Sequence, residues 1–150
     1  MSCRGEDRSD NCVSDILRQI VDAQNDIVEN DCDISCKQSI EDLLGDTTSP
    51  SGLDTVPVLL YCECKPFKGF GVRNDQNRTC VASFYFRVQK VYDDDCAVLE
   101  LLRDPADSRQ NPSDPCEQKT ANLRSTGICI NVDLDCFCHV TCLPATNARN

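Results

Sequence analysis

The sequence predicts an α+β protein that is mainly β, with an N-terminal helical segment followed by an antiparallel sheet or sandwich of five to six strands. Two patterns carry this prediction. Apolar residues recur at helical spacing from Val13 to Val28, which is typical of an amphipathic helix with one wet face. Beyond residue 55, apolar and polar residues alternate in several short runs, which is typical of half-buried strands.

The N-terminal part of the chain is expected to hold two helices. The first is predicted over residues 12–29, with Asn11 as its N-cap and Asp15 in the first turn, where a carboxylate suits the helix dipole. A second, shorter apolar stripe spans residues 36–44, and Gly45 is a natural C-terminal stop.

The rest of the chain is expected to form strands joined by turns. Strands are predicted over residues 56–64, 67–72, 79–92, 96–102, 128–134 and 136–143. The acidic turn Asp93–Asp95 makes a hairpin of the third and fourth, although it lacks glycine. The polar stretch 103–125 is the longest loop, and residues 144–150 are expected to be a frayed tail.

These parts are expected to make one structural unit with two sections. Residues 1–45 form an N-terminal arm with the helices, and residues 46–150 form a cysteine-rich β domain. A chain of 150 residues buries roughly 70% of its unfolded surface when it folds. Folding should therefore not require disulfides.

The chain nevertheless carries 13 cysteines, a number that exceeds what folding requires. Such a density is typical of disulfide scaffolds and of an oxidising destination. The count is odd, so full oxidation within one chain would leave one thiol for a second chain. The first residues lack the apolar run of a secretory signal, which predicts synthesis in a cytosol with later oxidation, or metal binding in a reducing cell.

The net charge of −10 is unevenly placed along the chain. Residues 1–46 hold 4 basic and 12 acidic side chains, whereas residues 47–150 hold 11 basic and 13 acidic ones. Nucleic-acid binding needs a cationic footprint, so we expect no nucleic-acid partner. No stretch reaches the 18 or more apolar residues of a membrane span, so we expect no membrane partner either.

The last apolar segment, residues 128–143, is predicted to be two short strands. In the first, one face is apolar: Ile128, Ile130, Val132 and Leu134. In the second, one face carries three thiols spaced about 7 Å apart. That face consists of Cys136, Cys138, Val140 and Cys142. His139 points to the opposite face.

The residues alone leave several roles open for the cysteines. Four residues of the types that bind zinc lie within seven positions and could make a zinc-binding structural module: Cys136, Cys138, His139 and Cys142. Structural zinc sites, however, usually combine two ligand pairs that are separated in the sequence. A catalytic thiol would have to use the single histidine, His139, which the strand pattern leaves exposed. Other cysteines, such as Cys80 and Cys96 among apolar strand neighbours, can be small buried hydrophobes.

Disulfide cross-linking, within and between chains, accounts best for the surplus and for cysteines in polar sequence. We expect no catalytic residue, no bound metal and no cofactor. The candidates for disulfides or cross-links are Cys3, Cys12, Cys32, Cys36, Cys62, Cys64, Cys116, Cys129, Cys136, Cys138 and Cys142.

Several short blocks also resemble a known family. They are Met1-Ser2-Cys3, Cys12-Val13, Phe86-Arg87-Val88, Asp95-Cys96-Ala97-Val98-Leu99 and Val132-Asp133-Leu134-Asp135-Cys136-Phe137-Cys138 followed by Cys142-Leu143. Together they resemble the CotY/CotZ family of spore coat proteins from endospore-forming bacteria, which includes the exosporium protein ExsY. The most specific block is the last one. Inside it, His139-Val140-Thr141 departs from the smaller or more apolar residues of the family, which leaves a metal role open.

The resemblance implies a non-enzymatic structural protein of the spore surface, in the outer coat, crust or exosporium. It implies synthesis in the mother-cell cytosol, followed by self-assembly and cross-linking through cysteine into a protective layer. The expected assembly is a homo-oligomer, with six-fold rings joined in a hexagonal two-dimensional lattice. The expected partners are further copies of the chain and other spore coat or exosporium proteins.

Overall fold

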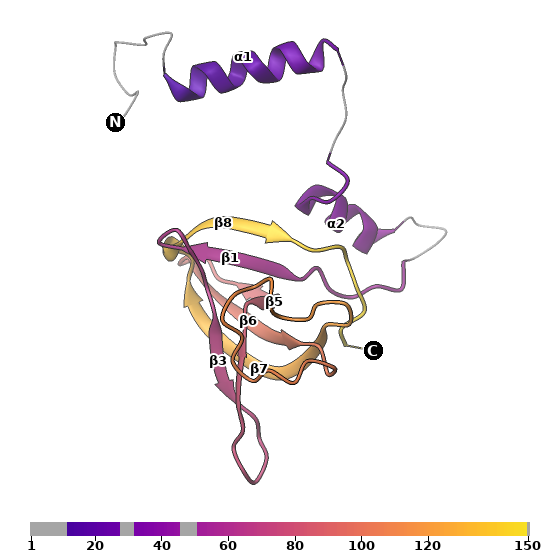
Figure 1. Cartoon of the computed structure of the whole chain (residues 1–150), viewed down its shortest axis with the longest axis vertical. Helices are drawn as coiled ribbons and strands as arrows, with labels where there is room; N and C mark the ends of the chain where they lie inside the picture. The colour runs from indigo at the N-terminus through magenta and orange to yellow at the C-terminus, as the bar shows by residue number, and fades with distance from the viewer. Residues whose placement is uncertain (1–11, 28–31, 46–50, 150) are drawn as a thin grey trace. The chain divides into compact units, whose positions relative to one another are not determined.

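The computed structural model describes residues 12–27, 32–45 and 51–149. The chain divides into two compact units, Met1–Cys32 and Asp33–Asn150. The first unit contains helix α1 (Val13–Asn25), and the second contains helix α2 (Cys36–Leu44) and the strands (Figure 1). The predicted fold class, α+β and mainly β with the helices first, is confirmed.

Both helices form where the apolar spacing predicted them, with different ends. Helix α1 stops at Asn25 rather than at residue 29, because asparagine and the following Asp26 favour turns over helix interiors. Its N-cap is Cys12, not Asn11, which lies outside the described residues. Helix α2 is capped by Ser35, whose hydroxyl accepts a hydrogen bond from the backbone N–H of Gln38 at 3.0 Å.

Helix α2 ends as predicted at Gly45, which adopts a positive φ of 61°. A buried hydroxyl helps to hold this helix on the sheet. The Ser39 Oγ donates to the carbonyl oxygen of Leu143 at 2.7 Å.

Six strands form one antiparallel sheet in the order β2-β1-β5-β6-β7, and β8 pairs with the other side of β1. These strands are β1 (Val58–Cys62), β2 (Lys65–Pro66), β5 (Tyr85–Val91), β6 (Cys96–Arg103), β7 (Arg124–Asp133) and β8 (Phe137–Cys142). A separate hairpin consists of β3 (Gly69–Val72) and β4 (Cys80–Ser83). Figure 1 shows β3 running across the strands of the larger sheet.

The hairpin of β5 and β6 confirms the sequence prediction, and an aspartate takes the place of the missing glycine. Asp95 adopts a φ of 64°, a conformation that aspartate tolerates better than most residues. The next pair, β6 and β7, has a register that matters for the site. Cys96 lies opposite Asp133 at one end, and Arg103 lies opposite Arg124 at the other.

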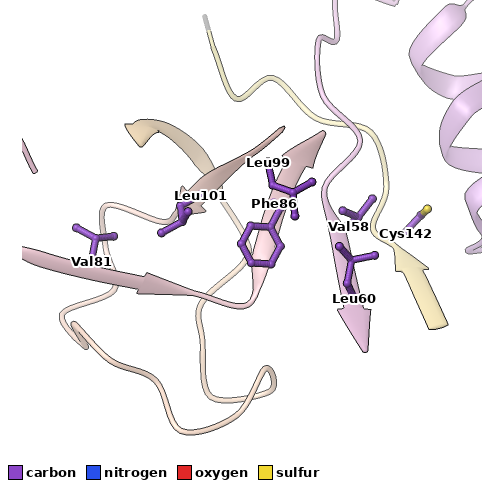
Figure 2. Close-up of a cluster of buried hydrophobic side chains, with 7 residues drawn as sticks. All are labelled: Val58, Leu60, Val81, Phe86, Leu99, Leu101 and Cys142. Carbon is purple, nitrogen blue, oxygen red and sulfur yellow. The ribbon is translucent and has the colours of Figure 1, made fainter. Parts of the chain in front are cut away.

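One face of the sheet carries the main apolar core. It gathers side chains from β1, β4, β5, β6 and β8, which Figure 2 shows in a row across these strands, from Val81 at the left to Cys142 at the right. They are Val58, Leu60, Val81, Phe86, Leu99, Leu101 and Cys142. The predicted apolar face of β7 packs against this core through Ile128, Ile130 and Val132.

Strand β3 approaches this core closely because it has glycine at two positions. A Cβ placed on Gly69 would lie 2.7 Å from the Phe86 ring, and one placed on Gly71 would collide with the Ile128 Cγ2 atom. The hairpin therefore packs backbone to side chain on the sheet, with no room for a methyl group between them.

The opposite face of the sheet is covered by the long loop and the C-terminal segment. Its core consists of Leu59, Phe84, Tyr85, Leu102, Leu123 and Ala148. The loop 104–123 is fastened to the strands by buried hydrogen bonds, since the Tyr85 hydroxyl donates to the Pro115 carbonyl at 2.9 Å and Gln118 accepts from the Phe84 N–H at 3.0 Å. The loop is thus a structural cover for this face.

Two sequence predictions about the strands and one about the C-terminal tail are wrong. The single strand expected over 79–92 is broken at Phe84, whose ring is buried on the second face, so that β4 and β5 belong to different sheets. Cys62 and Cys64 do not share a strand face, because Glu63 and Cys64 form a turn with positive φ. The expected frayed tail is ordered up to residue 149, since Thr146 bridges Thr55.

Replacing Gly71 with alanine should destabilise the domain by about 1–3 kcal/mol, because Ile128 is β-branched and cannot swing away freely. Urea denaturation measures the effect. Val72→Ala is the matched control, since Val72 is exposed and its truncation should change the free energy of unfolding by at most about 0.5 kcal/mol. Equal stability of the two variants would show that the hairpin does not pack tightly on β7.

Candidate cross-linking sites

Among the described residues, two disulfides close the second unit, Asp33–Asn150. The first joins Cys36 of α2 to Cys142 of β8, with a Cα–Cα distance of 4.8 Å. It reinforces the Ser39 hydrogen bond and fixes α2 to the outer strand of the sheet. Because it closes a loop across a sequence separation of 106, it removes much of the freedom of the unfolded chain.

The second disulfide joins Cys62, at the end of β1, to Cys136, with a Cα–Cα distance of 5.3 Å. Cys136 lies in a short 3-10 helix, η1 (Leu134–Cys136), which precedes β8. The predicted stripe of three thiols on one strand face is therefore wrong. Cys136 is outside the strand, Cys138 is exposed, and Cys142 is buried against the core.

The N-terminal candidates are described only in part. Cys12 takes part in a disulfide. Cys3 lies outside the described residues.

In the described residues, seven cysteines are free and exposed: Cys32, Cys64, Cys80, Cys96, Cys116, Cys129 and Cys138. The prediction that Cys80 and Cys96 are buried hydrophobes is wrong. Each is the first residue of its strand, so the core that covers Ala82 and Ala97 does not reach it. The outward-facing thiols thus lie on β4, β6, β7 and β8, in the turn after β1, in the long loop and in the segment before α2.

Two of these thiols have a raised pKa. For Cys96, desolvation and the carboxylates of Asp94, Asp133 and Asp95 raise the pKa above its usual value. For Cys129, desolvation and the nearby Glu100 carboxylate raise the pKa. Since the thiolate is the form that reacts, these neighbours slow disulfide chemistry at both positions.

The four candidate zinc ligands do not lie together in the structure. Cys136 and Cys142 are bonded to different partners, and His139 stacks on the Tyr61 ring with centroids 4.4 Å apart. The imidazole Nε2 also lies 3.0 Å from the Thr141 hydroxyl rather than beside a thiol. Within the described residues, no group of three or more histidine, cysteine or acidic side chains could hold a metal ion.

A basic pocket of about 450 Å³ is the feature that the sequence did not predict. Its lining includes Arg73, Arg103, Arg109 and Arg124, with the free thiol of Cys80 among them. The four arginines are spread over more than fifty positions of the sequence, so no local motif predicts that they come together. Among the described helices, none is long and apolar enough to cross a membrane.

The fold and the sulfur chemistry define a disulfide-closed, cysteine-rich β-domain protein with many accessible thiols. Comparison with known proteins identifies the family of this chain. A family model described as "Spore coat protein Z" matches residues 1–145, and the chain therefore belongs to this spore coat protein family. Spore coat protein Z of Bacillus subtilis (strain 168) is 34% identical over 142 residues, which cover 91% of this chain and 90% of that protein. No solved structure is significantly similar.

Removing the first disulfide by the double change Cys36→Ala and Cys142→Ala should destabilise the oxidised domain by about 2–5 kcal/mol. Urea denaturation without reductant measures this loss, and added reductant should shrink the difference from the wild type. Cys116→Ala with Cys129→Ala is the control, because both thiols are free and exposed. A control that loses as much stability would assign the effect to cysteine content rather than to the bond.

Asp94→Asn should raise the rate at which iodoacetamide alkylates Cys96. Without the Asp94 charge, the raised pKa of Cys96 falls toward its usual value, and more thiolate is present at pH 8. Peptide mass spectrometry follows the rate, with the alkylation of Cys116 as the internal standard. An unchanged rate at Cys96 would mean that Asp94 does not control this thiol.

Proposed function

We propose that this chain is a structural protein of the bacterial endospore's outer layers, the coat, crust or exosporium. It self-assembles there into a disulfide-cross-linked, hexagonal two-dimensional protective array, together with other spore surface proteins. The family and the relative's name support a place in the spore coat. The observation that carries the proposal is the set of exposed free thiols in the described residues, six of which lie in the unit that is already closed by its own disulfides.

The thiols point outward in several directions, and that distribution suits a network. A disulfide needs Cα atoms roughly 4.4–6.8 Å apart, so an exposed thiol can bond only where a partner is brought close. Thiols on one patch would give dimers. Thiols on β7, on β8 and in the long loop, such as Cys129, Cys138 and Cys116, allow one chain to be bonded to several others.

Non-covalent packing sets the geometry before the disulfides form. The domain leaves large apolar side chains exposed on its strands, including Phe70, Val72, Val91 and Val140. Heterologous contacts that close into rings, joined ring to ring, generate a sheet that can cover a surface. We propose that the chain acts without catalysis, is made in the mother-cell cytosol and reaches the spore surface by this assembly.

Electron microscopy of recombinant protein with and without reductant tests this order of events. Ordered sheets should form in both conditions, and heating should dissolve only the reduced ones, because disulfides lock contacts that already exist. A variant with Cys116, Cys129 and Cys138 changed to serine should still form sheets, but its oxidised sheets should resist heat less than those of the wild type, because fewer intermolecular disulfides can form. If the reduced chain stays monomeric at every concentration, disulfides drive assembly and the proposed order is wrong.

A further inference from the structure

The strand pair β6–β7 has opposite charges at its two ends. The antiparallel register places Arg103 opposite Arg124 at one end and Cys96 opposite Asp133 at the other. The seven steps of β6 from Cys96 to Arg103 separate the ends by roughly 23 Å. We call the first end the basic pole and the second the acidic pole.

The basic pole is the arginine-lined pocket. Arg103 is buried and fixed, since its guanidinium donates to the carbonyl oxygens of Ala82 and Arg109. Arg124 donates to the Asn147 carbonyl at 2.8 Å. Arg73 is exposed, and in the part of the chain that the structure describes its guanidinium makes no hydrogen bond or ion pair.

The two carboxylates in the pocket lining are already used. Asp104 accepts from the backbone N–H groups of Ala106 and Asn122. Asp107 accepts from the N–H groups of Arg109 and Lys119, which help to hold its pKa below the usual value. Arg103 lies 3.9 Å from the Asp107 carboxylate and Arg109 lies 3.7 Å from that of Glu117, so two of the four guanidinium groups already have a carboxylate partner. The four arginines still outnumber the two aspartates of the lining, which leaves the pocket positive on a chain whose net charge is −10.

The acidic pole is the turn between β5 and β6. Asp93, Asp94 and Asp95 are all exposed at its tip, and the turn is braced because Leu134 donates its N–H to the Asp95 carbonyl at 2.8 Å. Asp133 adds a fourth carboxylate beside it. The pocket volume of about 450 Å³ is within the range of sites that hold small groups, so carboxylate side chains from such a turn can enter it.

We infer that the acidic pole of one copy docks into the basic pole of the next, which forms a head-to-tail contact closed by an intermolecular disulfide between Cys96 and Cys80. This inference rests on the proposed self-assembly and specifies one of its contacts. Copies that carry a net charge of −10 repel one another, so a contact must join unlike patches. A head-to-tail contact is heterologous, and it can close into a ring.

The two thiols are placed for this bond. Cys80 lines the pocket, and Cys96 directly follows the aspartate turn. In the isolated chain, desolvation and the neighbouring carboxylates raise the pKa of Cys96. The arginines of the docked pocket offset these charges and favour the thiolate, so the contact activates the thiol that then locks it.

A low-molecular-weight disulfide such as oxidised glutathione supplies the oxidant. The Cys96 thiolate attacks one sulfur of that disulfide and expels one small thiol, leaving a mixed disulfide. The Cys80 thiolate of the neighbouring copy then attacks the Cys96 sulfur and expels the second small thiol. The two protons released by the cysteines are carried by the two small thiols.

Charge reversal in reducing buffer tests the contact without any disulfide. Arg73→Glu alone and Asp94→Arg alone should each weaken self-association about tenfold, measured as the dissociation constant by analytical ultracentrifugation. Both changes in one chain should restore it, and so should a mixture of the two single variants. Glu41→Arg is the control, because it reverses an exposed charge on α2, which belongs to neither pole.

Oxidation tests the intermolecular disulfide between Cys80 and Cys96. An equal mixture of ¹⁴N- and ¹⁵N-labelled protein, treated with oxidised glutathione, should yield a Cys80–Cys96 peptide that carries both labels. Cys80→Ser and Cys96→Ser should each remove this peptide, whereas Cys116→Ser should leave it.

The outcomes separate the two proposals. If the wild type assembles and Arg73→Glu assembles equally well, the head-to-tail contact is wrong and the proposed function stands. If association is restored in the double variant but no mixed-label Cys80–Cys96 peptide forms, the proposed disulfide is wrong and the head-to-tail contact stands. A wild-type chain that never associates would overturn the proposed function itself.

Discussion

A carboxylate buried inside the sheet ties four parts of this fold together. Glu100 of β6 is 2% exposed, and a buried charge is tolerated only when its oxygens are fully bonded. Gln89 of β5 donates to it at 2.6 Å, and Ser125 and Gly127 of β7 donate at 3.2 and 2.9 Å. The C-terminal segment completes the set with Arg149 at 3.2 Å. The pairing of β5, β6 and β7, the positive φ of Gly127 and the path of the C-terminal segment together bring the hydrogen-bond donors to the Glu100 carboxylate.

Local pattern predicted those parts of the fold whose cause is local. The apolar spacing before Gly45, the alternation on either side of Asp93–Asp95 and the apolar face of β7 each specify an element through neighbouring residues. The break at Phe84 could not be predicted, because that ring turns toward a core completed by Leu123 and Ala148 much later in the chain. The order of the last residues likewise depends on Asp54, which accepts from the N–H groups of Ala148 and Arg149.

The sequence indicated what the cysteines do as a set, but not what each one does. The surplus and the odd count pointed to disulfides, yet the exposure of Cys80 and Cys96 depends on where a strand begins, a boundary that periodicity locates only within a few residues. Pairings such as Cys62 with Cys136 follow from the placement of β1 beside β8. The arginine pocket is beyond any local pattern, since its members meet only through the β6–β7 register and the crossing of β3.

The two internal disulfides have one further consequence, which concerns the unfolded chain. The bond from Cys62 to Cys136 lies wholly inside the loop closed by Cys36 and Cys142, so residues 36–142 form two nested covalent rings. Strands β2 to β7 lie inside both. When heat separates the sheet, these strands stay confined within a small volume, and the cost in entropy of bringing them together again is reduced. A chain closed by two nested disulfides is therefore suited to refold without a chaperone after a brief exposure to high temperature.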